Sequence, residues 1–139
     1  MKKLLFLIVA IVGFQGFAQG KLAVIEFKQT EIDYGKIEKN ADGTRIFEFT
    51  NTGDAPLIIN RVKSSCGCTV PSKPNKPIMP GKSDKIVVKY NTHRTGPFRK
   101  TLTVYSNAKN NVVILKIKGK VFDPDAIDLK RKSASPMIR

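Results

Sequence analysis

The sequence predicts an all-β fold, because apolar and polar residues alternate with a period of two through most of the chain. Turn residues interrupt the alternation about every eight to twelve positions, a spacing typical of antiparallel sandwiches. No window of about a dozen residues places apolar side chains at the i, i+3, i+4 and i+7 positions of an amphipathic helix. Together these observations predict an immunoglobulin-like antiparallel β-sandwich of about seven strands.

The clearest predicted strand is Arg45–Thr50, which follows a turn at Asn40–Gly43 and places Phe47 and Phe49 on one face. A long loop is expected over Pro71–Gly81, because prolines recur there and proline donates no hydrogen bond to a strand ladder. The other predicted strands are Val24–Lys28, Ile32–Ile37, Leu57–Lys63, Lys85–Tyr90, Lys100–Tyr105 and Val112–Val121.

One face of these strands is apolar and supplies the predicted core. Burial of a large apolar side chain stabilises the folded state by about 1.5–3 kcal/mol, so this set offsets the chain entropy of one domain. The predicted core residues are Phe27, Phe47, Phe49, Leu57, Ile59, Ile86, Val88, Leu102, Val104, Val113, Leu115 and Ile117.

Residues 1–18 have the pattern of a secretory signal peptide. Two lysines follow the first residue, Leu4–Phe14 is an apolar run, and Gly16 and Ala18 occupy the −3 and −1 positions of a cleavage site. The run is shorter than the ~20 apolar residues of a membrane-spanning helix. We therefore expect an exported protein, periplasmic or extracellular, with one folded domain at residues 19–122 and no transmembrane segment after cleavage.

The alternation ends at Phe122, and residues 123–139 are predicted to be a basic, flexible C-terminal tail. The tail contains the basic run Lys130–Lys132 and few apolar residues. A short helix is compatible with its start, where Asp123 is able to cap and Pro124 to occupy the first turn.

The residue counts exclude several functional classes. The chain has one histidine and two cysteines, which is fewer than the four ligands of a zinc finger. No Ser/His/acid set, phosphate-binding glycine loop or paired carboxylate motif is present. The sequence therefore predicts a non-enzymatic protein without a cofactor.

The chain is strongly basic, with 25 Lys and Arg against 11 Asp and Glu. Loss of residues 1–18, which include Lys2 and Lys3, lowers the formal charge only from +14 to +12. Such a charge resembles that of nucleic-acid-binding domains, but export and the lack of interleaved aromatic residues argue against nucleic acid. Anionic cell-envelope surfaces or another protein are the expected partners. Lysines that protect sheet edges and keep the protein soluble are the alternative explanation.

Cys66-Gly67-Cys68 is the chemically unusual segment of the sequence. In an exported protein two cysteines usually form a disulfide. In a flat strand the Cα atoms of residues i and i+2 are ~6.5 Å apart, near the upper limit for a bridge, and Gly67 is able to fold the segment more tightly. A bridge that closes so small a ring is strained and easily reduced.

Several roles for the cysteine pair remain open at this stage. The first is a short structural disulfide, or two semi-buried thiols, that hold the end of a strand against the proline-rich loop. The second is a Cu(I) site, because thiolates suit this ion and Met79 or His93 could add a ligand. The third is thiol–disulfide redox chemistry, which the flanking cations Lys63 and Lys73 would favour by lowering a thiol pKa. The last is an intermolecular link.

Several short motifs lie between Ile32 and Val121, among them Asn51-Thr52-Gly53 and Cys66-Gly67-Cys68-Thr69. In these motifs the chain resembles one family of bacterial secreted proteins, the domain of unknown function 1573. The family is similar in turn to the Hydin-like and major-sperm-protein-like immunoglobulin domains. The resemblance implies a seven-stranded sandwich and an exported location, and it implies no activity. The motif residues are Asn51, Gly53, Cys66, Gly67, Cys68 and Thr69.

Overall fold

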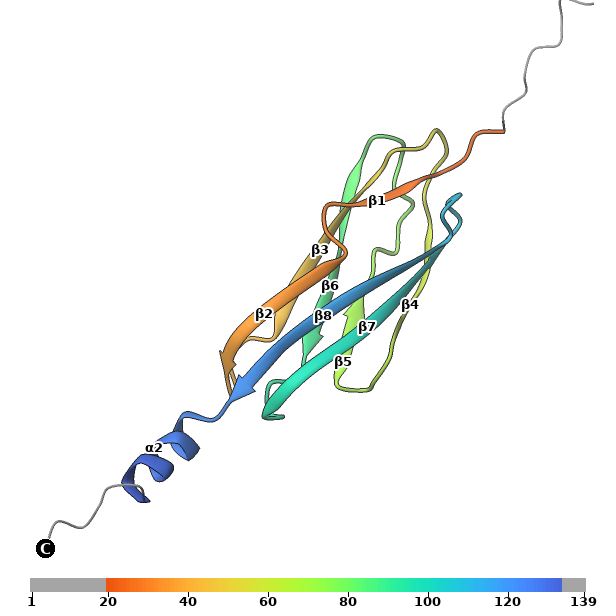
Figure 1. The fold of residues 1–139 in the computed structure, drawn as a ribbon. Helices are drawn as coiled ribbons and strands as arrows, with labels where there is room; N and C mark the ends of the chain where they lie inside the picture. The colour runs from red at the N-terminus through yellow and green to blue at the C-terminus, as the bar shows by residue number, and fades with distance from the viewer. Residues whose placement is uncertain (1–19, 134–139) are drawn as a thin grey trace, which may run out of the picture.

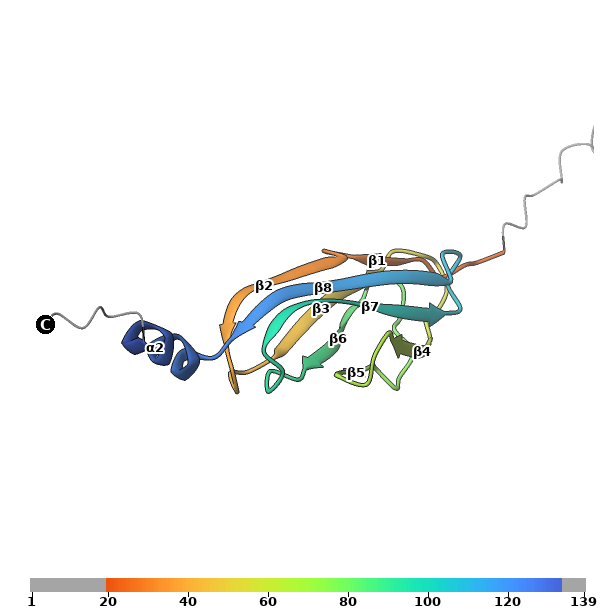
Figure 2. The same cartoon turned by 60° about the horizontal axis from the view of Figure 1, so that its bottom comes forward.

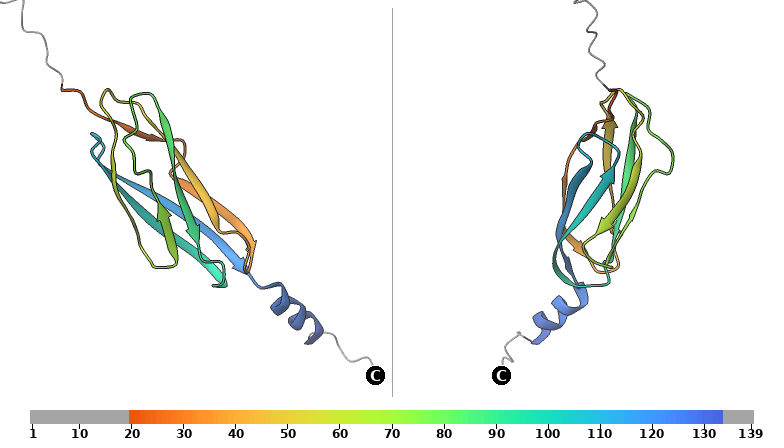
Figure 3. Two further views of the ribbon diagram at one scale, coloured as in Figure 1. Left: turned by 180° about the vertical axis from the view of Figure 1, so that it is seen from behind. Right: turned by 90° about the vertical axis from the view of Figure 1, so that its right-hand side faces the viewer.

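The computed structural model describes residues 20–133, which form two four-stranded sheets and one helix (Figure 1). The first sheet has the order β1-β3-β6-β5, with β1 at Ile25–Phe27, β3 at Thr44–Asn51, β6 at Ser83–Tyr90 and β5 at Thr69–Ser72. The second has the order β2-β8-β7-β4, with β2 at Glu31–Glu38, β8 at Val112–Phe122, β7 at Gly96–Ser106 and β4 at Ile59–Ser64. The sheets lie face to face as two layers (Figures 2 and 3). The predicted all-β sandwich is confirmed.

Strand β5 makes the number of strands eight, where about seven were predicted, and it contains Pro71, which was expected to begin a loop. The backbone N–H of Asn91 donates to the C=O of Cys68 over 2.9 Å. Hydrogen bonding alternates along an antiparallel ladder, so Val70 and Ser72 direct their backbone groups toward β6. The nitrogen of Pro71 therefore faces the free edge of the sheet, where no donor is required.

The predicted antiparallel pairing is wrong at one place, because β2 runs parallel to β8. The chain passes from the first sheet to the second between β1 and β2, and β2 then follows the direction of the last strand. Alternation identifies the inward side chains of a strand but carries no information on the direction of its neighbour. The pairing shifts register between Asp33 and Lys36, where Gly35 has a φ of 62°.

The predicted core residues are all buried except Phe27 and Val113, which are half-buried. An aromatic cluster of Tyr34, Tyr90 and Phe98, which was not predicted, also lies in the core. The rings of Tyr90 and Phe98 are stacked with centroids 3.8 Å apart, and Tyr34 meets Phe98 edge-on at 5.2 Å. This cluster fills the end of the sandwich at which β6 ends and β7 begins.

Helix α2 (Pro124–Ser133) occupies the first part of the segment that was predicted to be a flexible tail. Asp123 caps it, since its Oδ1 accepts the N–H of Asp125 over 3.2 Å. The helix has no buried residue and extends away from the sandwich (Figure 1). Among residues 20–133, no helix is long and apolar enough to cross a membrane. The predicted signal peptide lies outside the described residues.

Candidate functional site

Asn51 of the motif has a structural role, because its side chain links several backbone segments at one end of the sandwich. Its side chain is fully buried. The Oδ1 atom accepts the N–H groups of Gly53 at 3.0 Å and Val24 at 3.3 Å. The Nδ2 atom donates to the carbonyls of Ala55 at 2.8 Å and Ile78 at 2.9 Å. All four bonds hold backbone segments together, which leaves this side chain no free group for a ligand.

Gly53 allows two backbone segments to approach closely. A Cβ at this position would lie 2.3 Å from the carbonyl oxygen of Leu22 and 2.5 Å from the nitrogen of Val24. No side chain fits such a space. The requirement for glycine at this motif position is therefore a matter of packing.

Cys66 and Cys68 are joined by a disulfide in the segment between β4 and β5, with Sγ atoms 2.08 Å apart and Cα atoms 5.4 Å apart. Cys66 is half-buried, whereas Cys68 is 7% exposed. The Sγ atom of Cys66 lies 3.7 Å from Oγ1 of Thr69, a buried residue. A disulfide sulfur carries no hydrogen, so the hydroxyl is the donor.

The sequence suggested that Gly67 adopts a backbone conformation open to glycine, which brings the two sulfurs together. The structure does not show such a conformation. The φ of Gly67 does not lie in the left-handed region, which the structure assigns to Gly35, Gly81 and Gly96. Gly67 is exposed, and a Cβ added to it would meet no atom within 4 Å outside its chain neighbours Cys66 and Cys68. Neither backbone conformation nor packing therefore demands a glycine at this position.

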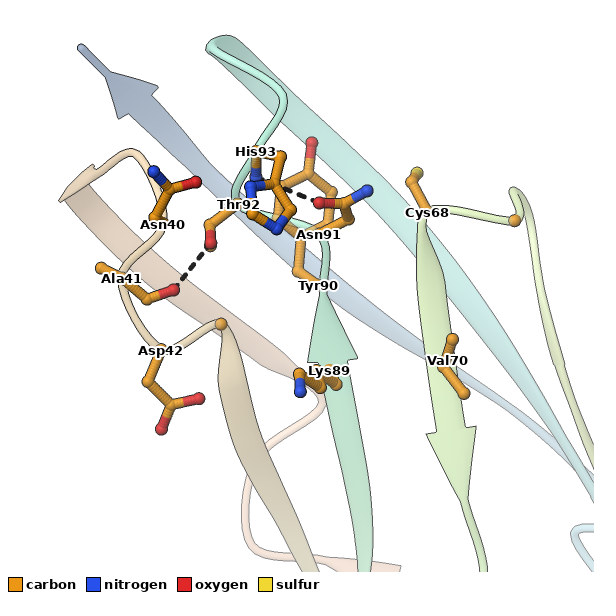
Figure 4. A pocket seen from close by; sticks show the side chains of 12 residues that line it. Asn40, Ala41, Asp42, Cys68, Val70, Lys89, Tyr90, Asn91, Thr92 and His93 are labelled. Atoms are coloured by element: carbon orange, nitrogen blue, oxygen red, sulfur yellow. Dashed lines mark hydrogen bonds between the residues drawn. The ribbon is translucent and has the colours of Figure 1, made fainter.

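A pocket of about 440 Å³ borders Cys68 of the disulfide (Figure 4). It lies at the end of the sandwich where β6 ends. Three segments far apart in the sequence form it: the β2–β3 turn, the Gly67–Cys68 segment, and the end of β6 with the loop that follows. The lining residues are Asn40, Ala41, Asp42, Gly43, Gly67, Cys68, Val70, Lys89, Tyr90, Asn91, Thr92 and His93.

Hydrogen bonds hold the turn and the loop of this pocket in place. Thr92 Oγ1 donates to the carbonyl of Ala41 over 2.7 Å (Figure 4). The hydroxyl of Tyr34 donates to the carbonyl of Gly43 over 2.9 Å, and burial raises the pKa of Tyr34 to about 12. Hydrogen bonds from Thr44 lower the pKa of Asp42. The pocket wall thus contains the ionised carboxylate of Asp42, and the hydroxyl of Tyr34 supports the wall from behind through the carbonyl of Gly43.

The structure brings together only one of the two extra ligands considered for Cu(I). His93 lines the same pocket as Cys68. Met79 is 54% exposed and lies near the far end of β4, next to the bridge between Leu57 and Ile78. Among residues 20–133, no group of three or more His, Cys, Asp and Glu side chains is close enough to hold a metal ion.

A second candidate site is the outer face of the β2-β8-β7-β4 sheet, which we call the basic face. On β8, Leu115, Ile117 and Val121 are buried, so the alternate positions face outward. The strand register then places basic residues of all four strands on the same face. These residues are Lys36, Arg61, Lys63, Arg99, Lys116, Lys118 and Lys120.

Three acidic residues, Glu31, Asp33 and Glu38, share the basic face with its seven basic residues. Glu31 and Asp33 both pair with Lys118, at 2.5 Å and 3.9 Å, and the hydrogen bond from Lys118 lowers the pKa of Glu31. Within the described part of the chain, the other six basic residues of this face form no ion pair. Arg61 stacks on the ring of Tyr105, 4.6 Å from its centroid.

The outer face of the other sheet is more evenly charged. Glu48 of β3 lies opposite Lys85 of β6 and forms an ion pair with Lys28. Thr50 and Ser83 share a hydrogen bond of 2.7 Å between their hydroxyls. The positive charge of the sandwich is therefore distributed unequally between its two faces.

Residues 25–121, from β1 to the end of β8, match the family model described as protein of unknown function DUF1573. The chain belongs to this family. The match confirms the resemblance inferred from the motifs, and it includes both Asn51-Thr52-Gly53 and the cysteine pair. No curated protein matches the sequence.

Solved structures confirm the fold of this DUF1573 member. A Porphyromonas gingivalis W83 protein of unknown function has a TM-score of 0.64 at 17% identity, and the match covers 78% of this chain and 51% of that one. The chain thus spans about half the length of that protein. PapD-like domain 7 of human CEP192 has a TM-score of 0.60 at 10% identity, and the match covers 71% of the present chain and 85% of that one. A chain of the CsuC–CsuE chaperone–tip adhesion subunit complex of Acinetobacter baumannii has a TM-score of 0.51 at 14% identity. This match covers 81% of the present chain and 66% of that one. At these identities the likeness shows a PapD-like, immunoglobulin-like sandwich and nothing more.

Proposed function

We propose that the protein is an exported, non-enzymatic binding module that attaches to anionic cell-envelope surfaces through its basic face. The family description assigns no activity. One fold can have many functions, so the function is inferred here from the charged side chains on the surface of the sandwich. Export rests on the signal-peptide pattern of residues 1–18.

The observation that carries the proposal is the placement of like charges opposite one another on the basic face. Lys36 lies directly opposite Lys120, and Arg99 lies directly opposite Lys118, which also pairs with Glu31 and Asp33. Like charges at such positions destabilise a sheet. An anionic ligand that approaches this face would relieve the repulsion and gain attraction from several strands at once.

An anionic lipid or polysaccharide surface fits this face better than a small ligand does. The basic residues are spread over four strands on an open sheet, and seven of them face the same side. Each Lys or Arg near an anionic membrane contributes about 1 kcal/mol to attachment. The basic last turn of α2, at Lys130–Lys132, adds charge beyond one end of this sheet.

The proposal is tested by sedimentation with vesicles that contain phosphatidylglycerol, with vesicles of phosphatidylcholine as the neutral reference. We expect binding only to the anionic vesicles, and we expect it to weaken steeply as salt is added. The variant Lys36→Gln/Arg99→Gln/Lys120→Gln should bind about a hundredfold more weakly, since three charges are lost.

A matched control removes three charges elsewhere, in Lys82→Gln/Lys85→Gln/Lys89→Gln. Lys85 and Lys89 belong to β6 in the other sheet, so this variant should retain most of the binding. Equal loss in both triple variants would mean that net charge alone attracts the protein. Absence of binding by the parent at low salt would refute the proposal and leave solubility or a protein partner as the role of the lysines.

A further inference from the structure

We propose that the Cys66–Cys68 disulfide is a thiol–disulfide exchange site, which accepts two electrons from thiols that approach it at Gly67. This site is separate from the basic face, and its test does not depend on binding to anionic surfaces. Three features carry the inference: an open approach to the sulfurs, unequal exposure of the two cysteines, and a scaffold that holds the segment when the bridge opens.

The open approach comes from Gly67. This residue is exposed, its φ is not left-handed, and apart from Cys66 and Cys68 no residue has an atom within 4 Å of a Cβ placed there. Gly53, by contrast, has no room for any side chain. Because folding does not require a glycine at position 67, its lack of a side chain has its main effect on access. A larger side chain would occupy part of this open space beside the cysteine pair.

The two cysteines are unequal, which gives the exchange a direction. Cys66 is half-buried and receives a hydrogen bond from the hydroxyl of Thr69, 3.7 Å from its Sγ. Cys68 is 7% exposed and borders the pocket. Cys66 is the more exposed of the two residues, so we expect an incoming thiolate to attack its Sγ atom. In the reduced protein the same hydroxyl stabilises a Cys66 thiolate.

The scaffold does not rely on the bridge. β4 is held by β7, and β5 is held by β6, so both flanks of the cysteine segment are anchored in sheets. The carbonyl of Cys68 accepts the N–H of Asn91 over 2.9 Å. The bridge joins residues only two apart, and opening it releases little chain. Reduction is therefore compatible with the folded state.

The chemistry consists of two thiol–disulfide exchanges. A thiolate attacks Cys66 Sγ, a new S–S bond forms, and the bond to Cys68 breaks. Its electron pair goes to Cys68 Sγ, which then takes a proton from water at the pocket. A second thiol attacks the first one in the mixed disulfide and releases Cys66 as a thiolate. The Cys66 thiolate then takes up a proton. Two thiols are thus oxidised to one disulfide, and the protein gains their two electrons and two protons. The natural co-reactant would be an exported protein with a thiol pair.

The test titrates the oxidised protein with defined ratios of reduced and oxidised glutathione. Thiols are alkylated and counted by intact mass, while far-ultraviolet circular dichroism reports the sheets. We expect two thiols to appear with an unchanged spectrum. A bridge that stays closed at every ratio, or that opens only as the sheets unfold, would overturn the proposal and make the disulfide purely structural.

Two pairs of variants test the direction and the approach. With oxidised glutathione, Cys68→Ser should form its mixed disulfide at Cys66 roughly tenfold faster than Cys66→Ser forms one at Cys68, a difference of about 1.4 kcal/mol in activation free energy. Gly67→Val should slow reduction of the parent bridge severalfold. Gly20→Val is the control for it, since Gly20 also has open space. A reversed order of the cysteines would refute attack at Cys66, and equal rates for both glycine variants would refute approach at Gly67.

Discussion

Two glycines of the family motif stand in the chain for opposite physical reasons. Around Gly53 the backbone of residues 22–24 leaves no room for a methyl group, so the residue is fixed by packing. Around Gly67 no residue other than its chain neighbours lies within 4 Å of a Cβ position. The same residue type is therefore structural at one position and is associated with access to a disulfide at the other. Only contacts in three dimensions separate the two cases.

The first prediction compares these positions. Gly53→Ala should destabilise the protein by about 1–3 kcal/mol, because the backbone must shift to admit the Cβ. Gly67→Ala is the matched control and should change the free energy of unfolding by less than about 0.5 kcal/mol. Urea denaturation of both variants measures the difference. Similar stability for the two variants would contradict the packing role of Gly53.

The second prediction concerns Tyr34, whose pKa burial raises to about 12. Above pH 10 the unfolded chain loses a phenolic proton that the folded chain retains, so stability falls as the pH rises from 10 toward 12. At neutral pH, Tyr34→Phe should lower the free energy of unfolding by about 1 kcal/mol, because the hydrogen bond to the carbonyl of Gly43 is lost. That carbonyl still accepts the N–H of Tyr90, so it is not left without a partner. Denaturation at several pH values should show the deficit of the variant shrinking above pH 10. A deficit independent of pH would contradict the assigned shift.

At the scale of elements, alternation predicted most strands to within a few residues because it depends on burial alone. It failed for β5, where Pro71 is tolerated since its nitrogen faces the free edge of the sheet. It also failed for the parallel pairing of β2, because the direction of a neighbouring strand leaves no trace in the burial pattern.

The candidate sites were predictable only in part. Cys66 and Cys68 attract attention by their spacing, yet the sequence leaves their bonding open. The pocket depends on segments around residues 40–43 and 91–93, which have no common sequence signal. The basic face requires the register between strands, whereas composition reports only the excess of charge.

The third prediction concerns α2, which has no buried residue. Removal of residues 124–139 keeps Asp123 and its 2.8 Å ion pair with Lys39, so the melting temperature should change by a few degrees at most. Truncation after Gly119 is the control, because it removes Val121, which is 1% exposed and pairs with Ile37. A fall of ten degrees or more after removal of α2 would show that the helix packs on the sandwich.

At the scale of the whole molecule, stability and chemistry lie in different places. The core extends between the sheets and contains fully buried residues such as Phe47, Leu102 and Leu115. The disulfide, the pocket and the basic face lie at its periphery. Changes at these sites should therefore alter binding or reactivity while the fold persists, which allows the two proposals to be tested independently.

The last prediction follows from this separation. Cys66→Ser/Cys68→Ser should remain a folded all-β protein, destabilised by roughly 1–2 kcal/mol, since one sulfur is buried. A bridge between residues two apart restricts the unfolded chain much less than a fifteen-residue loop, for which the contribution is ~3 kcal/mol. Leu102→Ala is the comparison and should cost about 2–5 kcal/mol, because it opens a cavity in the core. Circular dichroism and urea denaturation measure both variants. If the double serine variant were unfolded at room temperature, or less stable than Leu102→Ala, the sandwich would depend on its disulfide, and reduction in the folded state would be excluded with it.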